Sequence, residues 1–212
     1  MDRMTEDFNN LPVGIEQLEK LQSVRLSIGV PWTNSRLNMI ALVNEYGADD
    51  SIADAYQSIK PKNKAYLIIP TKEAKGRKPG EIANLFRPKP PHNHVLAVPD
   101  KSQPYGMRVM FILKDEVHIP PRPFLRYTFD HYLDNWTELA ADLAFKVFVG
   151  EINYQDVFPV LGDAVVEDIK RTIKEFSKPK NAPLTIANKG FDDPLIEKGE
   201  LRDSIHWITE RI

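Results

Sequence analysis

Cysteine is absent from this chain of 212 residues. Without thiols the chain cannot form disulfide bonds, thiolate zinc sites or a cysteine nucleophile, and it suits synthesis in a reducing cytoplasm. A membrane helix needs about 18 consecutive apolar residues, and no apolar run approaches that length. The N-terminal residues MDRMTEDFNN are too polar for a signal peptide. These absences predict a soluble protein with no membrane partner.

An excess of charge of either sign is also missing, with 28 Lys and Arg against 30 Asp and Glu. The net charge of −2 therefore gives no reason to expect nucleic acid as a general partner. Catalytic motifs are lacking too: the glycines make no phosphate-binding loop, and neither a nucleophile elbow nor a His-Glu-x-x-His helix occurs. We expect no catalytic residues, no metal and no cofactor, and we do not expect an enzyme.

The N-terminal part of the chain has clear hydrophobic patterns. Residues 14–22 place apolar side chains at helical spacing, which predicts a short amphipathic helix. Residues 24–30 alternate between apolar and polar, which predicts a strand with one wet face. The continuous apolar run within residues 37–47 predicts a second, buried strand, and the turn-forming residues 31–35 would join the two strands in a hairpin.

Residues 49–117 differ in character, because prolines interrupt them at short intervals. Strand-like pieces lie between the prolines and favour edge strands. Residues 71–81 are basic and nearly free of apolar side chains, as in a mobile loop. The pattern predicts a β-rich inserted subdomain or arm, carried by a core domain of residues 1–48 and 118–212. The predicted strands of the insertion are residues 65–70, 94–99 and 107–114.

The C-terminal half is mainly helical in pattern. Prolines hold residues 119–124 extended, and apolar residues from 129 to 147 then follow helical spacing up to a stop at Gly150. A second helix is expected over 161–176, then a long polar loop, and the chain closes with a strand. The aromatic residues of the first long helix are predicted to be ordinary core. The fold class is α+β: an antiparallel sheet packed by two long helices, with a β-rich insertion.

Two histidines and a basic cluster are the candidates for polar chemistry. His92 and His94 could hold a metal with Glu116 in a small metal-dependent nuclease, but their proline-rich flanks favour a solvated turn. The basic cluster could contact DNA or an acidic surface, although no interleaved aromatic residues are present to stack bases, so a solvated loop is favoured. Its members are Lys72, Lys75, Arg77 and Lys78.

Three segments, taken together and in order, resemble the virion-morphogenesis or tail-completion family of tailed phages. They are ALVNEYGA (41–48), IPPRPFLR (119–126) and PLTIANKGFDDPLIEKGELRDSI (183–205), with the two predicted long helices between the second and the third. Two features depart from the family pattern. Lys198 stands where the resemblance predicts Thr, and the insertion of residues 49–117 has no counterpart.

The resemblance implies a structural protein of the virion, in the neck or upper tail, assembled in the host cytoplasm. It would form a homo-oligomeric ring, hexameric or alternatively dodecameric, that completes the tail and joins it to the head. Its partners would be tail-tube or terminator proteins and head-connector proteins, with DNA passing transiently through the lumen. The non-viral alternatives are the small nuclease and an adaptor whose insertion binds a peptide.

The resemblance also implies a set of assembly residues and no catalytic ones. Arg122 lies between two prolines, so it is expected either to pair with a carboxylate, with Glu45 as a candidate, or to lock the start of the long helix. Glu45 has no second carboxylate at a spacing suited to acid–base catalysis, which favours a structural role. The predicted assembly residues are Glu45, Arg122, Phe124, Lys189, Pro194, Leu195, Gly199 and Leu201.

Overall fold

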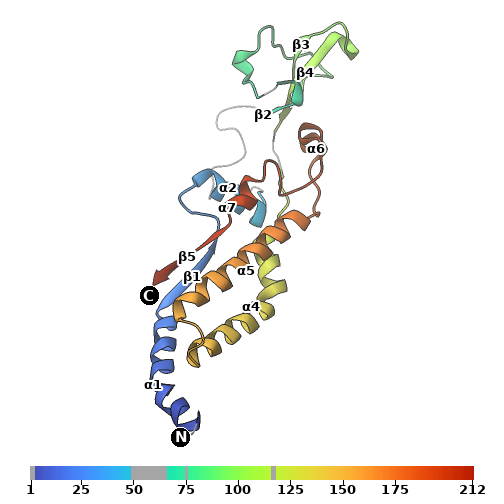
Figure 1. The fold of residues 1–212 in the computed structure, drawn as a ribbon. Coiled ribbons are helices and arrows are strands. Elements are labelled where there is room, and N and C mark those ends of the chain that lie inside the picture. Colours follow the sequence, from blue (N-terminus) through green and yellow to red (C-terminus); the bar gives the residue numbers. More distant parts are fainter. Residues whose placement is uncertain (1–2, 49–65, 75, 116–117) are drawn as a thin grey trace. The chain divides into compact units, whose positions relative to one another are not determined.

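The computed structural model describes residues 3–48, 66–74, 76–115 and 118–212 (Figure 1). The chain divides into two compact units. The first, called the helical unit here, comprises Met1–Glu45, Arg122–Phe176 and Leu195–Ile212. The second, called the insert unit, comprises Tyr46–Pro121 together with Ser177–Pro194, a stretch that the sequence prediction had assigned to the core domain. Among the described residues, no helix is both long and apolar enough to cross a membrane.

The helical unit contains a two-stranded antiparallel sheet of β1 (Val24–Gly29) and β5 (His206–Arg211). Leu26 lies opposite Thr209 and Ile28 lies opposite Trp207. Both strands are confirmed predictions, because alternation of apolar and polar residues suits a sheet with one covered face. The predicted hairpin is wrong, because the partner of β1 is the C-terminal strand and not the segment that follows it.

Residues 35–46 form a helix, α2 (Ser35–Tyr46), so the strand predicted over 37–47 is wrong. Leu37, Ala41 and Glu45 are buried at intervals of four residues, which is helical and not strand-like spacing. The side chain of Asn34 accepts a hydrogen bond from the backbone N–H of Leu37 at 3.1 Å and caps the first turn. Gly47, with φ +76°, ends the helix in the left-handed conformation.

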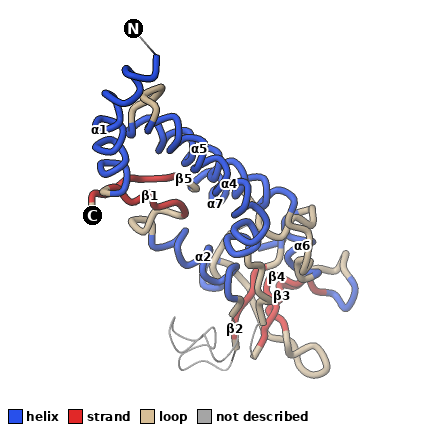
Figure 2. Tube along the Cα trace, turned by 90° about the horizontal axis from the view of Figure 1, so that it is seen from below, coloured by secondary structure: helices blue, strands red, loops and turns tan. Residues whose placement is uncertain are grey.

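Three longer helices build most of the helical unit: α1 (Arg3–Gln22), α4 (Phe124–Phe148) and α5 (Tyr154–Glu175). Helix α5 packs across β1 and β5, α4 packs along α5, and α1 packs against both helices (Figure 2). The three helices confirm the prediction and are longer than predicted. Asn153 and Asp156 form a capping box at the start of α5, and the proline in that helix lies in its second turn, at Pro159.

Strand β5 approaches α5 so closely that only glycine fits at position 162. A Cβ atom on Gly162 would lie 2.6 Å from the ring of Trp207. The indole Nε1 of Trp207 donates a hydrogen bond of 2.7 Å to Asp163, which fixes the ring over the glycine. This contact joins the last strand to the helix layer.

Gly162→Ala is therefore expected to destabilise the helical unit, although alanine favours a helix by about 1 kcal/mol over glycine. Overpacking against the fixed indole should outweigh that gain by about 1 kcal/mol. In a Trp207→Ala background the same change should instead stabilise the protein, since the obstacle is gone. Urea denaturation of the parent protein, the two single variants and the double variant measures these changes in the free energy of unfolding. If Gly162→Ala changes stability in the same direction with and without Trp207, the contact is contradicted.

The insert unit contains a three-stranded antiparallel sheet in the order β2-β4-β3. The strands are β2 (Leu67–Pro70), β3 (Val95–Pro99) and β4 (Met107–Lys114), which confirms all three predicted strands. Prolines end the two edge strands and are absent from the central one, as the hydrogen bonding of a sheet requires. The predicted loop of residues 71–81 includes two 3-10 turns, η1 (Lys72–Ala74) and η2 (Pro79–Glu81), while a third, η3 (Pro104–Gly106), precedes β4.

The predicted late loop also has regular structure. It contains α6 (Pro183–Lys189), which belongs to the insert unit, and α7 (Glu200–Ser204), which belongs to the helical unit. Gly190 ends α6 with φ +85°, and Gly199 precedes α7 with φ +81°. Both glycines allow the left-handed backbone that a turn between short helices requires.

Candidate functional site

The three segments that carry the family resemblance contribute to one core in the helical unit. The first segment supplies Ala41, and the second supplies Phe124, whose side chain is completely buried. The third segment supplies Leu195, Leu201 and Ile205 to the same cluster. Helix α5 completes the cluster with Val165, Ile169 and Ile173. Segments far apart in the sequence therefore depend on one another for burial.

Glu45 caps the first turn of α4. Its carboxylate accepts hydrogen bonds from the backbone N–H groups of Leu125, at 3.0 Å, and Arg126, at 3.1 Å. The guanidinium Nε of Arg126 lies 2.9 Å from the same carboxylate. Pro123, the residue before the helix, has no side chain that could cap it, so Glu45 supplies both the acceptor and the negative charge that a helix N-terminus favours. The structure thus gives Glu45 the structural role that its sequence context favoured.

Arg122 is also buried, with 6% of its surface exposed. Its backbone N–H donates to the carbonyl of Asn44, which ties the proline-rich segment to the end of α2. The guanidinium that contacts Glu45 is that of Arg126, a residue that the sequence prediction did not single out. Whether the buried Arg122 side chain serves assembly or locks the start of α4 is not decided by its burial, and both roles stay predictions.

Most of the remaining predicted assembly residues are buried. Phe124, Leu195 and Leu201 belong to the core, and Pro194 and Gly199 are buried as well. Lys189 donates a hydrogen bond of 2.7 Å to the carbonyl of Asp193 and lies 5.2 Å from the centre of the Phe191 ring. These contacts hold the late segment in place, and the assembly role of these residues stays a prediction. An exposed apolar surface suited to a neighbour is built from other residues.

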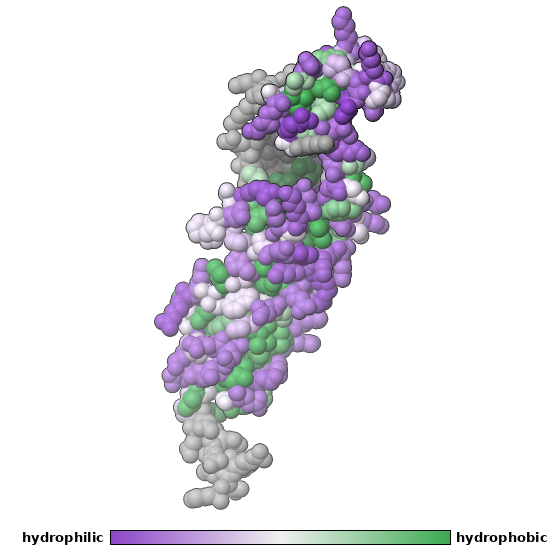
Figure 3. Space-filling model, turned by 45° about the horizontal axis from the view of Figure 1, so that its top comes forward, coloured by the Kyte–Doolittle hydropathy of each residue, from purple (hydrophilic) through white to green (hydrophobic). Residues whose placement is uncertain are grey.

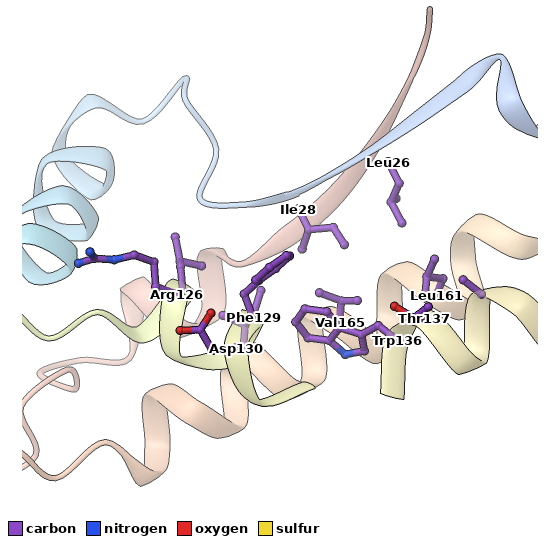
Figure 4. Close-up of a pocket in the computed structure, with 12 residues that line it drawn as sticks. Leu26, Ile28, Arg126, Phe129, Asp130, Trp136, Thr137, Leu161 and Val165 are labelled. Atoms are coloured by element: carbon purple, nitrogen blue, oxygen red, sulfur yellow. The ribbon is translucent and has the colours of Figure 1, made fainter. Parts of the chain in front are cut away.

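Such a surface exists in the helical unit as an open apolar groove of about 600 Å³ between β1 and α4 (Figure 4). Phe129 and Trp136 of α4 lie edge to face, with ring centres 6.3 Å apart, and 52% of Phe129 is exposed. In Figure 3 apolar side chains of the helical unit are visible among hydrophilic ones. The groove is lined by Leu26, Ile28, Leu125, Arg126, Phe129, Asp130, Trp136, Thr137, Ala140, Leu161, Val165 and Ile169.

Few polar groups lie in this groove, and most of those are already engaged. The indole Nε1 of Trp136 donates a hydrogen bond of 2.8 Å to Asp168, and Arg126 is paired with Glu45. Asp130 lines the groove and is exposed. A surface of this composition can bind apolar side chains but has no arrangement for acid–base or nucleophilic chemistry.

The groove was not predicted from sequence, because the aromatic residues of α4 were interpreted as core. A signal was present: 40% of Leu133 and 62% of Phe145 are exposed in addition to Phe129, so α4 carries more apolar residues than one buried face requires.

The histidines and basic residues of the insert unit lie in separate surroundings. The His92 ring contacts Tyr105, and His94 meets the edge of Tyr66. Within the described part of the chain, which leaves out Glu116, no three His, Cys, Asp or Glu side chains could together hold a metal ion. Lys72, Arg77 and Lys78 are exposed, whereas Lys75 is outside the described residues.

Asp100 is a carboxylate of the insert unit, and the partners described for it lie within that unit. It accepts hydrogen bonds from the hydroxyl and the backbone N–H of Ser102, and it is paired with Arg108 at 2.6 Å. Ser102 and then Arg108 lower the pKa of the Asp100 carboxyl to about 2. The group is a carboxylate at neutral pH, engaged in fixing the turn between β3 and β4.

Comparisons of this chain with protein-family models, with curated proteins and with solved structures found no match. The resemblance to tailed-phage proteins therefore rests on the three segments and their order in the sequence alone. Parts of all three segments, at Ala41, Phe124 and Leu201, meet in the core of the helical unit.

Proposed function

We propose that this chain is a structural subunit of the neck or upper tail of a tailed phage. It forms a ring that completes the tail and joins it to the head connector. The observation that carries the proposal is the meeting of the three resembling segments in one core, at Ala41, Phe124 and Leu201. The three segments are thus neighbours in the fold as well as an ordered set in the sequence.

The surface of the helical unit is consistent with such a role. A subunit of a closed ring presents two different patches, one for each neighbour, and further surface for the rings above and below. The apolar groove and the exposed Trp32, of which 83% is accessible, are two distinct apolar features of the helical unit. Exposed tryptophans are enriched among the residues that dominate binding at protein interfaces.

Removal of the gene from the virus that carries it tests the proposal. We expect lysates to contain filled heads and free tails that remain separate in electron micrographs, with infectivity reduced by several orders of magnitude. Supplying the unaltered gene in trans should restore joined particles. Joined, infectious particles made without the protein would overturn the proposal, as would a gene neighbourhood without capsid, connector and tail genes, which would favour the non-viral adaptor.

A further inference from the structure

One edge of β1 is open. The backbone N–H of Ile212 donates to the carbonyl of Ser23, and this bond fixes the alternation of the antiparallel pair. The backbone N–H and C=O groups of the residues at even positions consequently point away from β5. These residues are Val24, Leu26 and Ile28. In the described part of the chain no strand pairs with this edge. It presents a row of donors and acceptors suited to another strand.

The apolar groove lies directly below this open edge. Leu26 and Ile28 of β1 form one wall, and Phe129 and Trp136 of α4 form the other (Figure 4). A two-stranded ribbon is too narrow for two helices, because strands lie about 4.8 Å apart while packed helices lie about 8–10 Å apart. One more strand beside β1 would cover the exposed side of α4.

The geometry limits what that strand can be. Helix α4 already occupies the layer beneath the open edge, so the added strand cannot bring a helix packed on the same face. This requirement excludes the β1–β5 ribbon of a second copy. That ribbon would bring its own helix α5, which packs on β1 and β5, into the layer that α4 occupies. A single extended segment fits.

The groove and the turn of α4 beside it carry two exposed carboxylates. Asp130 lines the groove, Asp134 follows one helical turn later, and both are exposed. Within the part of the chain that the structure describes, neither has an ion pair. The one cation of the groove lining, Arg126, is paired with Glu45. The charge therefore complements a lysine or arginine on the bound segment.

We propose that the open edge of β1 is a docking site for an extended segment of a partner protein. The segment adds as a third strand, places apolar side chains at alternate positions into the groove, and carries a lysine or arginine opposite Asp130 and Asp134. Main-chain hydrogen bonds to Leu26 and Ile28 provide affinity, and the groove provides selectivity for alternating apolar residues.

Selection from a displayed library of random ten-residue peptides tests this proposal on the full chain. We expect enriched peptides to alternate apolar and polar residues and to contain a lysine or arginine. Their binding should fall by about tenfold or more in Phe129→Asp. Phe145→Asp is the matched control, because Phe145 is an exposed aromatic of the same helix outside the groove. Asp130→Lys should remove the preference for the basic residue and leave the apolar pattern unchanged.

Nuclear magnetic resonance of the labelled protein with the best selected peptide locates the contact. Slowed hydrogen exchange at the amides of Val24, Leu26 and Ile28 is the expected result. The proposal is overturned if no groove-dependent peptide is enriched, if the peptides lack alternation, or if the edge amides do not change. Shifts of the same amides with protein concentration alone would also overturn it, in favour of a second copy as occupant. All of these measurements use the purified protein, so their outcome is independent of whether the chain belongs to a phage neck.

Discussion

Replacement of Phe124 by alanine is expected to lower the free energy of unfolding of the helical unit by about 3–5 kcal/mol. Phe124 is completely buried, at the first residue of α4, in the core where the three resembling segments meet. Its removal would leave a cavity bordered by α2, α5 and the segment before β5, which the rigid proline-rich chain on its N-terminal side cannot collapse to fill.

Tryptophan fluorescence during urea denaturation measures the free energy of unfolding of the helical unit. All three tryptophans, Trp32, Trp136 and Trp207, belong to the helical unit, so their signal reports its unfolding. Phe145→Ala, at a position that is 62% exposed, is the matched control and should change stability by less than about 1 kcal/mol. Equal losses for the two variants would show that Phe124 does not hold the segments together.

The second large effect is expected for Glu45→Ala, with a loss of about 2–3 kcal/mol. The substitution removes the acceptor for two backbone N–H groups of α4 and the partner of Arg126, and alanine cannot replace either function. Glu45→Gln should lose less, because an amide oxygen can still accept a hydrogen bond although the favourable charge at the helix N-terminus is gone.

The same denaturation measurement applies, with Glu138→Ala as the control. Glu138 lies on the exposed surface of α4, and its replacement should have little effect on stability. Should Glu45→Ala unfold at the urea concentration of the parent protein, the cap would be energetically unimportant and the link between α2 and α4 would need another explanation.

The sequence predicted the elements whose pattern has one interpretation. The alternation of residues 24–30 and the long helical periodicity before Gly150 gave β1 and α4, and prolines marked the edge strands of the insert unit. Residues 37–47 were misassigned, because a short apolar run suits a buried strand as well as a helix face. The distinguishing features were Asn34 as a cap and Gly47 as a stop.

The candidate site was beyond prediction for a different reason. Whether Phe129 becomes core or surface depends on how many strands cover α4, and that number is a property of the sheet and not of the helix. In the same way, the pairing of Arg126 with Glu45 depends on the direction in which the first turn of α4 presents the Arg126 side chain. Neither the number of strands that cover α4 nor the direction of a side chain in its first turn follows from the local spacing of residues.

Whether and where purified phage particles contain this chain tests the central claim most directly. A tag at the C-terminus, where β5 ends, can be labelled with gold and observed by electron microscopy of purified particles. The proposed function predicts gold at the junction between head and tail in every labelled particle. Complete, infectious particles whose mass spectra contain no peptide of this chain would contradict it.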